Sequence, residues 1–468
     1  MNEMTKIAIV GAGITGLSSA YFIKKHYPHI DVTVYEATHQ PGGKIKTVQR
    51  DGYTIELGPE SYLGRKTIMT ELAKDIGIKD EEIITNKTGQ SFIFARNKLY
   101  PIPGGAILGV PTDIKPFMST KLISMKGKLR ALKDLKRKPI EMKEDLSVGS
   151  FFRYRLGDEI LENLIEPLLS GIYGTDIDQL SLMSTFPNFK TLEDTHGSII
   201  KGMQKVRLDR EKKHSHNTEG PQGQFKQFRN GLFSFIEQLE KWLKQNNVHF
   251  KYQTPVTDLI SEQKGYNVET AQEAPTFYDG VIVATPHQVF HKWFETDPGF
   301  DYFSRLEASS VATIVFAFDE KNIKNTSNGT GFVIARTSDT SITACTWTTK
   351  KWPHTTPKGK VLIRAYVGKP GDDIVETHSD EELVEIAKKD LSQMMTFYGE
   401  PDFTIVNKMP HASPQYHVGH IHEIKKIQEH IYREYPHLQI TGAPFEAVGL
   451  PDCIRQAQDA VQRLIPRI

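Results

Sequence analysis

Three glycines near the start of the chain have the spacing of a phosphate-binding turn. Gly11, Gly13 and Gly16 follow the β-rich run 7–10 and precede an apolar-periodic segment. The first glycine permits a tight turn, the second lets a pyrophosphate approach the backbone, and the third lets a helix and a strand pack closely. The N-terminus of the following helix would direct its N–H donors at the anion. This pattern predicts a phosphate cradle.

An acidic residue completes the pattern. Glu36 follows a second predicted strand, 31–35, and lies about 20 residues past Gly16, where it can accept hydrogen bonds from both hydroxyls of a ribose. The order of strand, glycine turn, helix, strand and acid predicts a dinucleotide site. The same glycines argue against a secretory signal at this position. A βαβ unit whose glycines serve only packing is the alternative.

The composition limits the classes of protein to which the chain can belong. Its 468 residues suit two or three domains, and 58 Lys and Arg against 57 Asp and Glu give no global sign of a nucleic-acid binder. The two cysteines, Cys345 and Cys453, lie far apart without metal-binding spacing, which favours a reducing, cytoplasmic setting. No apolar run approaches the roughly 18 to 20 residues that span a bilayer, so we expect any membrane contact to be peripheral.

The distribution of strand and helix patterns predicts interleaved domains. Residues 111–205 have a mostly helical pattern, and 311–369 alternate apolar and polar residues as the strands of a mixed or antiparallel sheet do. The chain begins and ends with a strand, a glycine loop and a helix, and 278–286 holds a similar strand. We expect one sheet assembled from three separated segments. Two independent α/β domains are the alternative.

The N-terminal motifs resemble the FAD fingerprint of the flavin amine oxidase superfamily. "GAGITG" is followed by Glu36 and by "PGGKIKT", whose counterpart in the superfamily is Arg-x-Gly-Gly-Arg-x-x-Thr. Gln40 and Lys44 stand at the two arginine positions, whereas the glycine pair and Thr47 match. Lys44 could contact a cofactor phosphate as a point charge, and a glycine turn with a solvated lysine is the alternative.

A closer resemblance extends over nearly the whole chain. "ELGPESYLGRK", "NLIEPLLSGIYGTDIDQLSLMSTFP", "ITACTWTTKKWPH", "RAYVGKPGD", "PQYHVGH" and "EAVGLPDCI" occur in the order seen in the coproporphyrinogen III oxidases of Gram-positive heme synthesis, which are relatives of protoporphyrinogen oxidase. The resemblance implies noncovalent FAD, a porphyrinogen substrate and dioxygen as oxidant, with six electrons removed and three H₂O₂ formed. It also implies a transient contact with ferrochelatase, the next enzyme of the pathway.

The resemblance implies a cofactor site on the glycine loops and beside them. Its residues are Gly11, Ala12, Gly13, Ile14, Thr15, Gly16, Glu36, Gly43, Lys44, Gly58, Pro59, Glu60, Ser61, Val256, Gly442, Val448, Gly449 and Leu450. Val256 would offer its backbone to the adenine, with core packing as the alternative. The loop 442–450 is the second flavin element, and a helix N-terminus there would stabilise a reduced flavin. We interpret Cys453 as a buried structural thiol rather than a covalent flavin link.

The candidates for substrate contacts are less specific. They are Arg65, Lys66, Ile172, Tyr173, Arg364 and Tyr366, and each of them could instead be a surface, sheet or core residue. The segment 115–139 carries nine Lys or Arg against one acid, Asp134, so it could guide a substrate with four propionates, meet a membrane surface, or be a solvated face. His417, His420 and His422 match no metal spacing, and we expect them at the surface or at the rim of a pocket.

We therefore predict an α/β fold, α+β overall, with a Rossmann-like FAD-binding domain assembled from 1–66, 224–290 and 436–468. The remaining predicted domains are a β-rich substrate-binding domain, formed by 67–91, 209–223 and 291–435, and a helical, membrane-surface-like domain at 92–208. No side chain is assigned as catalytic, since the cofactor supplies the redox chemistry, and no metal is predicted. The competing functions are a protoporphyrinogen IX oxidase, a flavin amine oxidase and a non-enzymatic lipid chaperone of the same fold.

Overall fold

The chain forms two compact units that are interleaved along the sequence. The computed structural model describes residues 4–86, 90–214, 223–325 and 327–468, apart from the side chains of 170–172, 210, 213 and 214. The first unit consists of Met1–Asn86, Gln224–Leu306 and His422–Ile468, and the second of Lys87–Gly223 and Glu307–Ile421. Residues 67–86, 291–306 and 422–435, which the sequence analysis assigned to the substrate-binding domain, thus belong to the first unit. The division into three domains stays a prediction.

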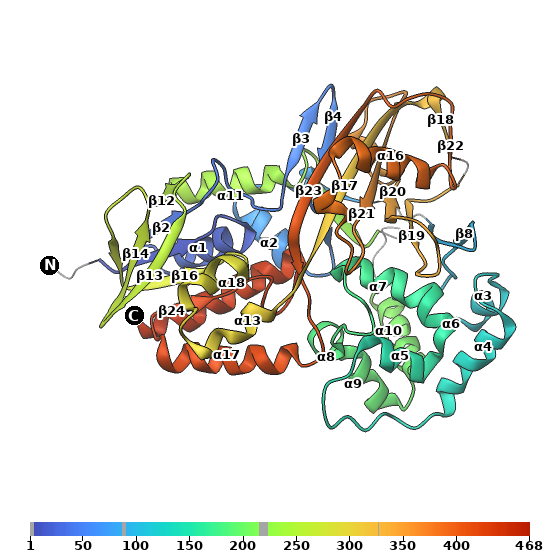
Figure 1. The fold of residues 1–468 in the computed structure, drawn as a ribbon, viewed down its shortest axis with the longest axis horizontal. Coiled ribbons are helices and arrows are strands. Elements are labelled where there is room, and N and C mark those ends of the chain that lie inside the picture. Colours follow the sequence, from blue (N-terminus) through green and yellow to red (C-terminus); the bar gives the residue numbers. More distant parts are fainter. Residues whose placement is uncertain (1–3, 87–89, 215–222, 326) are drawn as a thin grey trace. The chain divides into compact units, whose positions relative to one another are not determined.

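A parallel sheet forms the centre of the first unit (Figure 1). Within the described residues it has five strands, in the order β12 (Val248–Lys251), β2 (Asp31–Tyr35), β1 (Lys6–Val10), β16 (Gly280–Val283) and β24 (Leu438–Ile440). These strands come from three separate segments of the chain, so the predicted discontinuous sheet is confirmed. The connections from β1 diverge to either side of it, and ligands of such sheets bind at this switch point, beyond the carboxyl ends of the strands.

One face of this sheet is covered by helices. The alternating side chains of β1 turn Ile7 and Ile9 to this face, where they are completely buried. They pack in one core with α1 (Ile14–His26), α11 (Phe233–Gln245) and α18 (Leu450–Leu464). Helix α1 contacts both α11 and α18, so the helix that follows the glycine turn is fixed on two sides.

The opposite face of the sheet has a second core. Ala8 and Val10 of β1 lie in it, together with side chains from β13 (Val256–Glu262) and β14 (Gly265–Thr270), which pair in a small antiparallel sheet. Helix α17 (His420–Glu434) contributes isoleucines to the same core. The central strands are therefore buried on both faces, as expected for a parallel sheet.

A larger sheet forms part of the second unit. The described strands are ordered β23 (Phe403–Pro414), β17 (Ala308–Asp319), β21 (Lys360–Val367), β20 (Ile342–Thr346), β19 (Gly331–Ile334), β7 (Ser91–Ala95) and β8 (Lys98–Pro101). Neighbouring strands are antiparallel except β19 and β7. Helix α16 (Asp380–Leu391) packs Leu383, Ala387 and Leu391 into the core of this sheet. The predicted mixed or antiparallel sheet at 311–369 is confirmed.

The same unit contains a group of helices, shown in cyan to green in Figure 1. They include α3 (Ile114–Ser119), α4 (Met125–Leu132), α5 (Val148–Leu156), α7 (Glu166–Tyr173), α9 (Pro187–His196) and α10 (Ile199–His214). In the part of the chain that the structure describes, no helix is long and apolar enough to cross a membrane.

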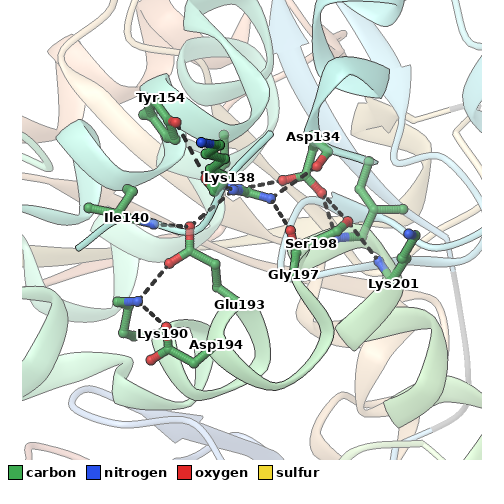
Figure 2. Close-up of polar contacts among 12 residues, drawn as sticks. Asp134, Lys138, Ile140, Tyr154, Lys190, Glu193, Asp194, Gly197, Ser198 and Lys201 are labelled. Carbon is green, nitrogen blue, oxygen red and sulfur yellow. Dashed lines mark hydrogen bonds and ion pairs between the residues drawn. The ribbon is translucent and has the colours of Figure 1, made fainter. Parts of the chain in front are cut away.

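Buried charges tie these helices together (Figure 2). The Arg155 network consists of Asp134, Arg155, Lys190, Glu193, Asp194 and Ser198. The side chains of Arg155, Asp134 and Glu193 are fully buried, and Arg155 Nη1 lies 3.1 Å from Glu193 Oε1 while its Nε pairs with Asp134. Arg155 also donates to the main-chain oxygens of Asp134 at 3.0 Å and Gly197 at 3.1 Å. One guanidinium thus joins α5, the segment before it, and the turn between α9 and α10.

The network contains the one acidic residue of the 115–139 segment. Asp134, its lone acid, is inside, whereas six of its lysines are exposed: Lys115, Lys121, Lys126, Lys133, Lys136 and Lys138. Lys128 is buried and donates to the carbonyls of Met118 and Thr120 at 2.8 and 2.6 Å. Arg130 is half-buried and donates to those of Arg153 and Tyr154 at 2.9 and 2.8 Å. These two cations hold the backbone together rather than belonging to an exposed basic face.

Candidate cofactor site

The three glycines of the N-terminal turn have different surroundings. A Cβ on Gly16 would lie 1.8 Å from the carbonyl oxygen of Gly11, and one on Gly11 would lie 2.9 Å from that of Ala284. Gly11 also has a φ of +102°, which other residues rarely adopt. By contrast, no described atom lies within 4 Å of the position of a Cβ on Gly13. Gly11 and Gly16 are therefore needed for packing, and Gly13 faces open space.

The open space at Gly13 adjoins the N-terminus of α1. Gly13 is the N-cap residue, and among the described residues no side chain caps it and no acid lies in the first turn. The helix therefore presents its first N–H groups and the positive end of its dipole to a ligand. The hydroxyl of Thr285, which borders Gly11, is also buried without a hydrogen-bond partner among the described residues. These features fit a bound pyrophosphate.

Glu36 lies beside this turn. Its Oε2 accepts a hydrogen bond from the Ala12 N–H at 2.8 Å, and its Oε1 accepts from the N–H and the hydroxyl of Thr38, both at 2.8 Å. The main chain of Glu36 is held as well, because its carbonyl accepts from the Thr254 N–H at 2.9 Å. The carboxylate therefore has a fixed direction next to the glycine turn.

The second glycine loop lies against the first. The Gly42 N–H donates to the Ala12 carbonyl at 2.9 Å, and a Cβ on Gly43 would lie 3.4 Å from the Cα of Gly13. Both glycines of the loop have positive φ angles, +111° and +58°, which explains why the sequence repeats glycine here. We refer to residues 11–16, Glu36 and 42–44 as the cofactor cradle.

Lys44 ends the second glycine loop. Burial among protein groups lowers the pKa of its ammonium, and the nearby Cys453 partly opposes this shift. Its side chain nevertheless remains accessible to solvent. Lys44 directly follows Gly43, whose Cβ would lie 3.4 Å from the Cα of Gly13, so the chain places its ammonium beside the glycine turn, where it can meet an anionic part of a ligand.

Residues 58–61 continue along the same region. A Cβ on Gly58 would lie 1.9 Å from the Lys44 carbonyl oxygen, so glycine is required for this close approach. Glu60 is buried, and its carbonyl accepts from the Gln227 side chain at 3.0 Å. Pro59 and Ser61 are half-buried.

The C-terminal glycine loop reaches the start of α1. Gly442 has a φ of +113°, and its Cβ would lie 3.6 Å from the Thr15 hydroxyl. Gly449 is the N-cap of α18, Val448 is half-buried, and Leu450 is buried. This arrangement places the second predicted flavin element next to the first.

The N-terminus of α18 differs from the expectation in one respect. Asp452 lies in its first turn and forms an ion pair with Lys66, with Nζ to Oδ distances of 2.5 and 2.6 Å. The positive end of this helix dipole therefore already has a carboxylate beside it. Lys66, a predicted substrate contact, is thus paired with Asp452 in this structure.

Cys453 follows in the same helical turn. Burial raises the pKa of its thiol to about 11, and its Sγ lies 3.7 Å from the Ala447 carbonyl oxygen. A buried thiol with a raised pKa is a poor nucleophile. Its surroundings are those of the structural thiol that the sequence analysis favoured.

Val256 begins β13 and is buried. Thr254, two residues earlier, donates to the carbonyl of Glu36, so Val256 lies close along the chain to the acid of the cradle. This neighbourhood is where the predicted adenine contact would be.

The other predicted substrate residues are distributed over both units. Arg65 is exposed in the first unit. In the second unit, Tyr173 is buried against the rings of Phe186 and Tyr416, while the side chain of Ile172 lies outside the described residues. Arg364 is completely buried in β21, with its guanidinium 5.3 Å from the ring centre of the half-buried Tyr366. Arg364 is thus a buried sheet residue, and the role of this set toward a substrate stays a prediction.

One of the three histidines differs from its predicted position. His420 is buried and its ring stacks on Tyr416 at 4.3 Å, because it lies at the start of α17 and packs inward. His422 is exposed, as expected. Across the described part of the chain, no group of three His, Cys, Asp or Glu side chains could hold a metal ion.

Two threonines contribute more than the sequence indicated. Thr38 was not assigned to the site, although it donates to Glu36 twice. Thr47, recognised only as part of a motif, donates to Glu56 at 2.8 Å and accepts from the Phe233 N–H at 3.0 Å, so it caps α11. A hydroxyl two residues after the ribose-binding acid was the available signal for Thr38, since such side chains commonly bond to groups two residues away.

Comparison with known proteins agrees with this geometry. Residues 14–465 match the model of the family described as flavin containing amine oxidoreductase. The chain belongs to this family of flavoproteins, which confirms both the predicted fold class and the use of a flavin.

Relatives with high sequence identity narrow the class further. The chain is 64% identical to the coproporphyrinogen III oxidase of Staphylococcus aureus strain NCTC 8325 / PS 47, over 99% of this chain and 100% of the relative. It is 44% identical to the coproporphyrinogen III oxidase of Bacillus subtilis strain 168, over 97% of each. A crystal structure from Exiguobacterium sp. 255-15 has a TM-score of 0.87 and 36% identity, over 98% of both chains. The predicted membership in the coproporphyrinogen III oxidases is confirmed.

Proposed function

We propose that this chain oxidises coproporphyrinogen III to coproporphyrin III with noncovalent FAD and dioxygen. Its relatives with 64% and 44% identity carry the name of this activity. The structural observation that carries the proposal is the open space at Gly13, next to an N-terminus of α1 that no described side chain caps. That space lies where a dinucleotide pyrophosphate binds in folds of this type.

The residues of the cradle divide the work of holding FAD. The first N–H groups of α1 bind the pyrophosphate, and Glu36 accepts from the ribose hydroxyls. Lys44 meets the cofactor with its ammonium. The raised pKa and burial of the Cys453 thiol support noncovalent attachment. When bound, FAD supplies an acceptor for two electrons in each of three rounds, so the substrate loses six hydrogen atoms while three O₂ become three H₂O₂.

The task of the protein toward the substrate is orientation. The porphyrinogen becomes aromatic on oxidation, so the reaction is strongly favourable, and we assign no side chain as its acid or base. Four propionates give the substrate its anionic character, and Arg65 offers an exposed guanidinium of the kind that binds carboxylates as a fork. Tyr173 and Tyr366 remain proposed contacts with the ring system.

The first experiment tests the cofactor. We expect the purified protein to be yellow, and acid precipitation to release all of the flavin into the supernatant as FAD. Flavin that stays with the precipitated polypeptide would contradict noncovalent attachment, and a colourless protein that takes up no FAD would contradict the oxidase.

The second experiment tests the substrate. We expect kcat/KM to be larger for coproporphyrinogen III than for protoporphyrinogen IX under matched oxygen and detergent conditions, with three H₂O₂ for each porphyrin. A clear preference for protoporphyrinogen IX would replace the proposed substrate while leaving the flavin chemistry in place.

A further inference from the structure

A ring of hydrogen bonds joins the parts of the cofactor cradle. The Ala12 N–H donates to Glu36 Oε2 at 2.8 Å, and the Thr38 N–H and hydroxyl donate to Glu36 Oε1, both at 2.8 Å. The Thr38 hydroxyl also lies 2.8 Å from the Gln40 carbonyl oxygen. The ring closes through the second glycine loop, because the Gly42 N–H donates to the Ala12 carbonyl at 2.9 Å.

Thr38 lies between the acid and the second glycine loop, with its hydroxyl 2.8 Å from both Glu36 Oε1 and the Gln40 carbonyl oxygen. Its hydroxyl has one proton, so it can donate to the Glu36 carboxylate or to the Gln40 carbonyl, and the charge-assisted bond to Glu36 is the stronger of the two. The Thr38 N–H donates to Glu36 in either case. The backbone of Thr38 is itself fixed, since its carbonyl accepts from the Gln253 N–H at 2.9 Å.

The effect on Glu36 is to remove its freedom to rotate. Oε1 accepts from both the N–H and the hydroxyl of Thr38, whereas Oε2 accepts only from Ala12 and keeps a lone pair for the ribose. The carboxylate is therefore held in one direction before a ligand arrives, so that binding does not have to order it. Thr38 is exposed to solvent, and its hydroxyl is not required to fill the core.

The ring is compatible with a departure of the sequence from the superfamily motif. Gln40 stands at an arginine position of that motif, but the ring uses its main-chain carbonyl and not its side chain. The exposed side chain of Gln40 is therefore a matched control for Thr38.

We propose that Thr38 is a positioning residue for the dinucleotide, which aims Glu36 at the ribose. The inference rests on the proposed FAD site and deepens it. It assigns to Thr38 a contribution to cofactor affinity that acts through Glu36 and not through contact with the reacting atoms.

The test compares three substitutions in the holoprotein. Thr38→Val keeps the shape and removes the hydroxyl, Thr38→Ser keeps the hydroxyl, and Gln40→Ala removes only an exposed side chain. The FAD dissociation constant is obtained from the fluorescence of flavin released on serial dilution. We expect Thr38→Val to raise it about tenfold, as loss of a charge-assisted hydrogen bond does. Thr38→Ser and Gln40→Ala should stay within about twofold of the wild type.

A double-mutant cycle tests whether Thr38 acts through Glu36. On a Glu36→Gln background, Thr38→Val should add less than about twofold, because the carboxylate that it orients is gone. An effect of Thr38→Val that is equally large on both backgrounds would overturn the inference, and so would a Thr38→Val protein that binds FAD as the wild type does. A wild-type protein that fails to hold FAD would instead overturn the proposed function.

Discussion

The cofactor cradle of the first unit and the Arg155 network of the second both join residues that are far apart in the chain, but by opposite means. In the cradle, side chains are missing: a Cβ on Gly16 has no room, and the space at Gly13 is left for a ligand. In the Arg155 network, charged side chains fill the interior and satisfy one another. Open space beside a glycine backbone therefore indicates a ligand site, whereas buried charges that are fully paired hold helices together.

Gly16→Ala should have the largest effect. The added Cβ would overlap the Gly11 carbonyl oxygen, a backbone atom that cannot move away cheaply. We expect a loss of more than about 4 kcal/mol in the free energy of unfolding, together with loss of FAD. Urea denaturation followed by circular dichroism measures the first and flavin absorbance the second. A stable, yellow Gly16→Ala protein would show that the turn has more room than the structure gives it.

Arg155→Met comes next. It leaves Asp134 and Glu193 buried without their shared cation, which typically destabilises a protein by about 3–5 kcal/mol. Urea denaturation again gives the value, and Lys126→Met, an exposed lysine of the same region, serves as the control. If both substitutions cost the same, the buried network would not be the joint that we describe.

Gly13→Val separates the two kinds of glycine. Gly13 has φ −70° and ψ 175°, which valine adopts readily, and no described atom would meet its Cβ. The protein without cofactor should therefore keep its stability, while the FAD dissociation constant rises at least about tenfold, or about 1.4 kcal/mol. Thermal unfolding with and without added FAD distinguishes the two effects. Unchanged FAD affinity would mean that the pyrophosphate does not lie at Gly13.

Glu166 is another buried charged residue of the second unit, and unlike the contribution of Arg155, its contribution to stability should depend on pH. Burial raises the pKa of Glu166 from 4.5 to about 7. The guanidinium of Arg336, 3.3 Å from Glu166 Oε1, opposes this shift, but it is shared with Asp176 and Asp178. The negative charges of Asp176, Asp178 and Glu162 raise the pKa of Glu166 further. Because the folded state binds this proton more tightly, the stability that the proton contributes is complete below about pH 4.5 and is lost as the pH rises through 7.

Glu166→Gln should remove this pH dependence. The variant gains stability relative to the wild type as the pH rises from 5 to 8, by at most about 3 kcal/mol. Arg336 keeps Asp176 and Asp178 as partners in the variant. Urea denaturation at both pH values measures the difference, and a difference that does not change with pH would contradict the raised pKa.

Lys66→Gln should have only a small effect on stability. Its ion pair with Asp452 is partly exposed, so we expect a change of less than about 1 kcal/mol. KM for coproporphyrinogen III should be measured for the same variant. If KM rises several-fold while stability stays the same, Lys66 contributes to substrate binding. If neither changes, Lys66 serves only as the partner of Asp452.

The sequence was most informative where a conformation depends on glycine. Gly11, Gly13, Gly16 and the strand before them define a local pattern whose spacing follows from sterics, and the sheet built from three segments could be anticipated from the strands at 7–10, 278–286 and the C-terminal region. The Arg155 network had no such signal, because its partners are separated by tens of residues and each alone resembles a surface charge. In the sequence, Asp134 is a single acid among basic residues; in the structure, it is the buried partner of Arg155.

Substrate contacts were hardest to predict for a related reason. Whether an arginine is exposed depends on the packing of whole strands, so Arg364 could not be distinguished from a surface residue until its place in β21 was known. Thr38 was missed because its contribution lies in hydrogen bonds to Glu36 and the main chain, and no motif marks them.

The sheet built from three segments has a consequence for synthesis on the ribosome. Strand β1 and helix α1 are made first, but α18, which packs against α1, follows more than 400 residues later. At a translation rate of about 5–20 residues per second, α18 is complete roughly 20–90 s after α1, and until then the apolar face of α1 lacks this partner. The glycine turn is thus translated long before β24 and α18, which complete the sheet and the core that hold this turn in place.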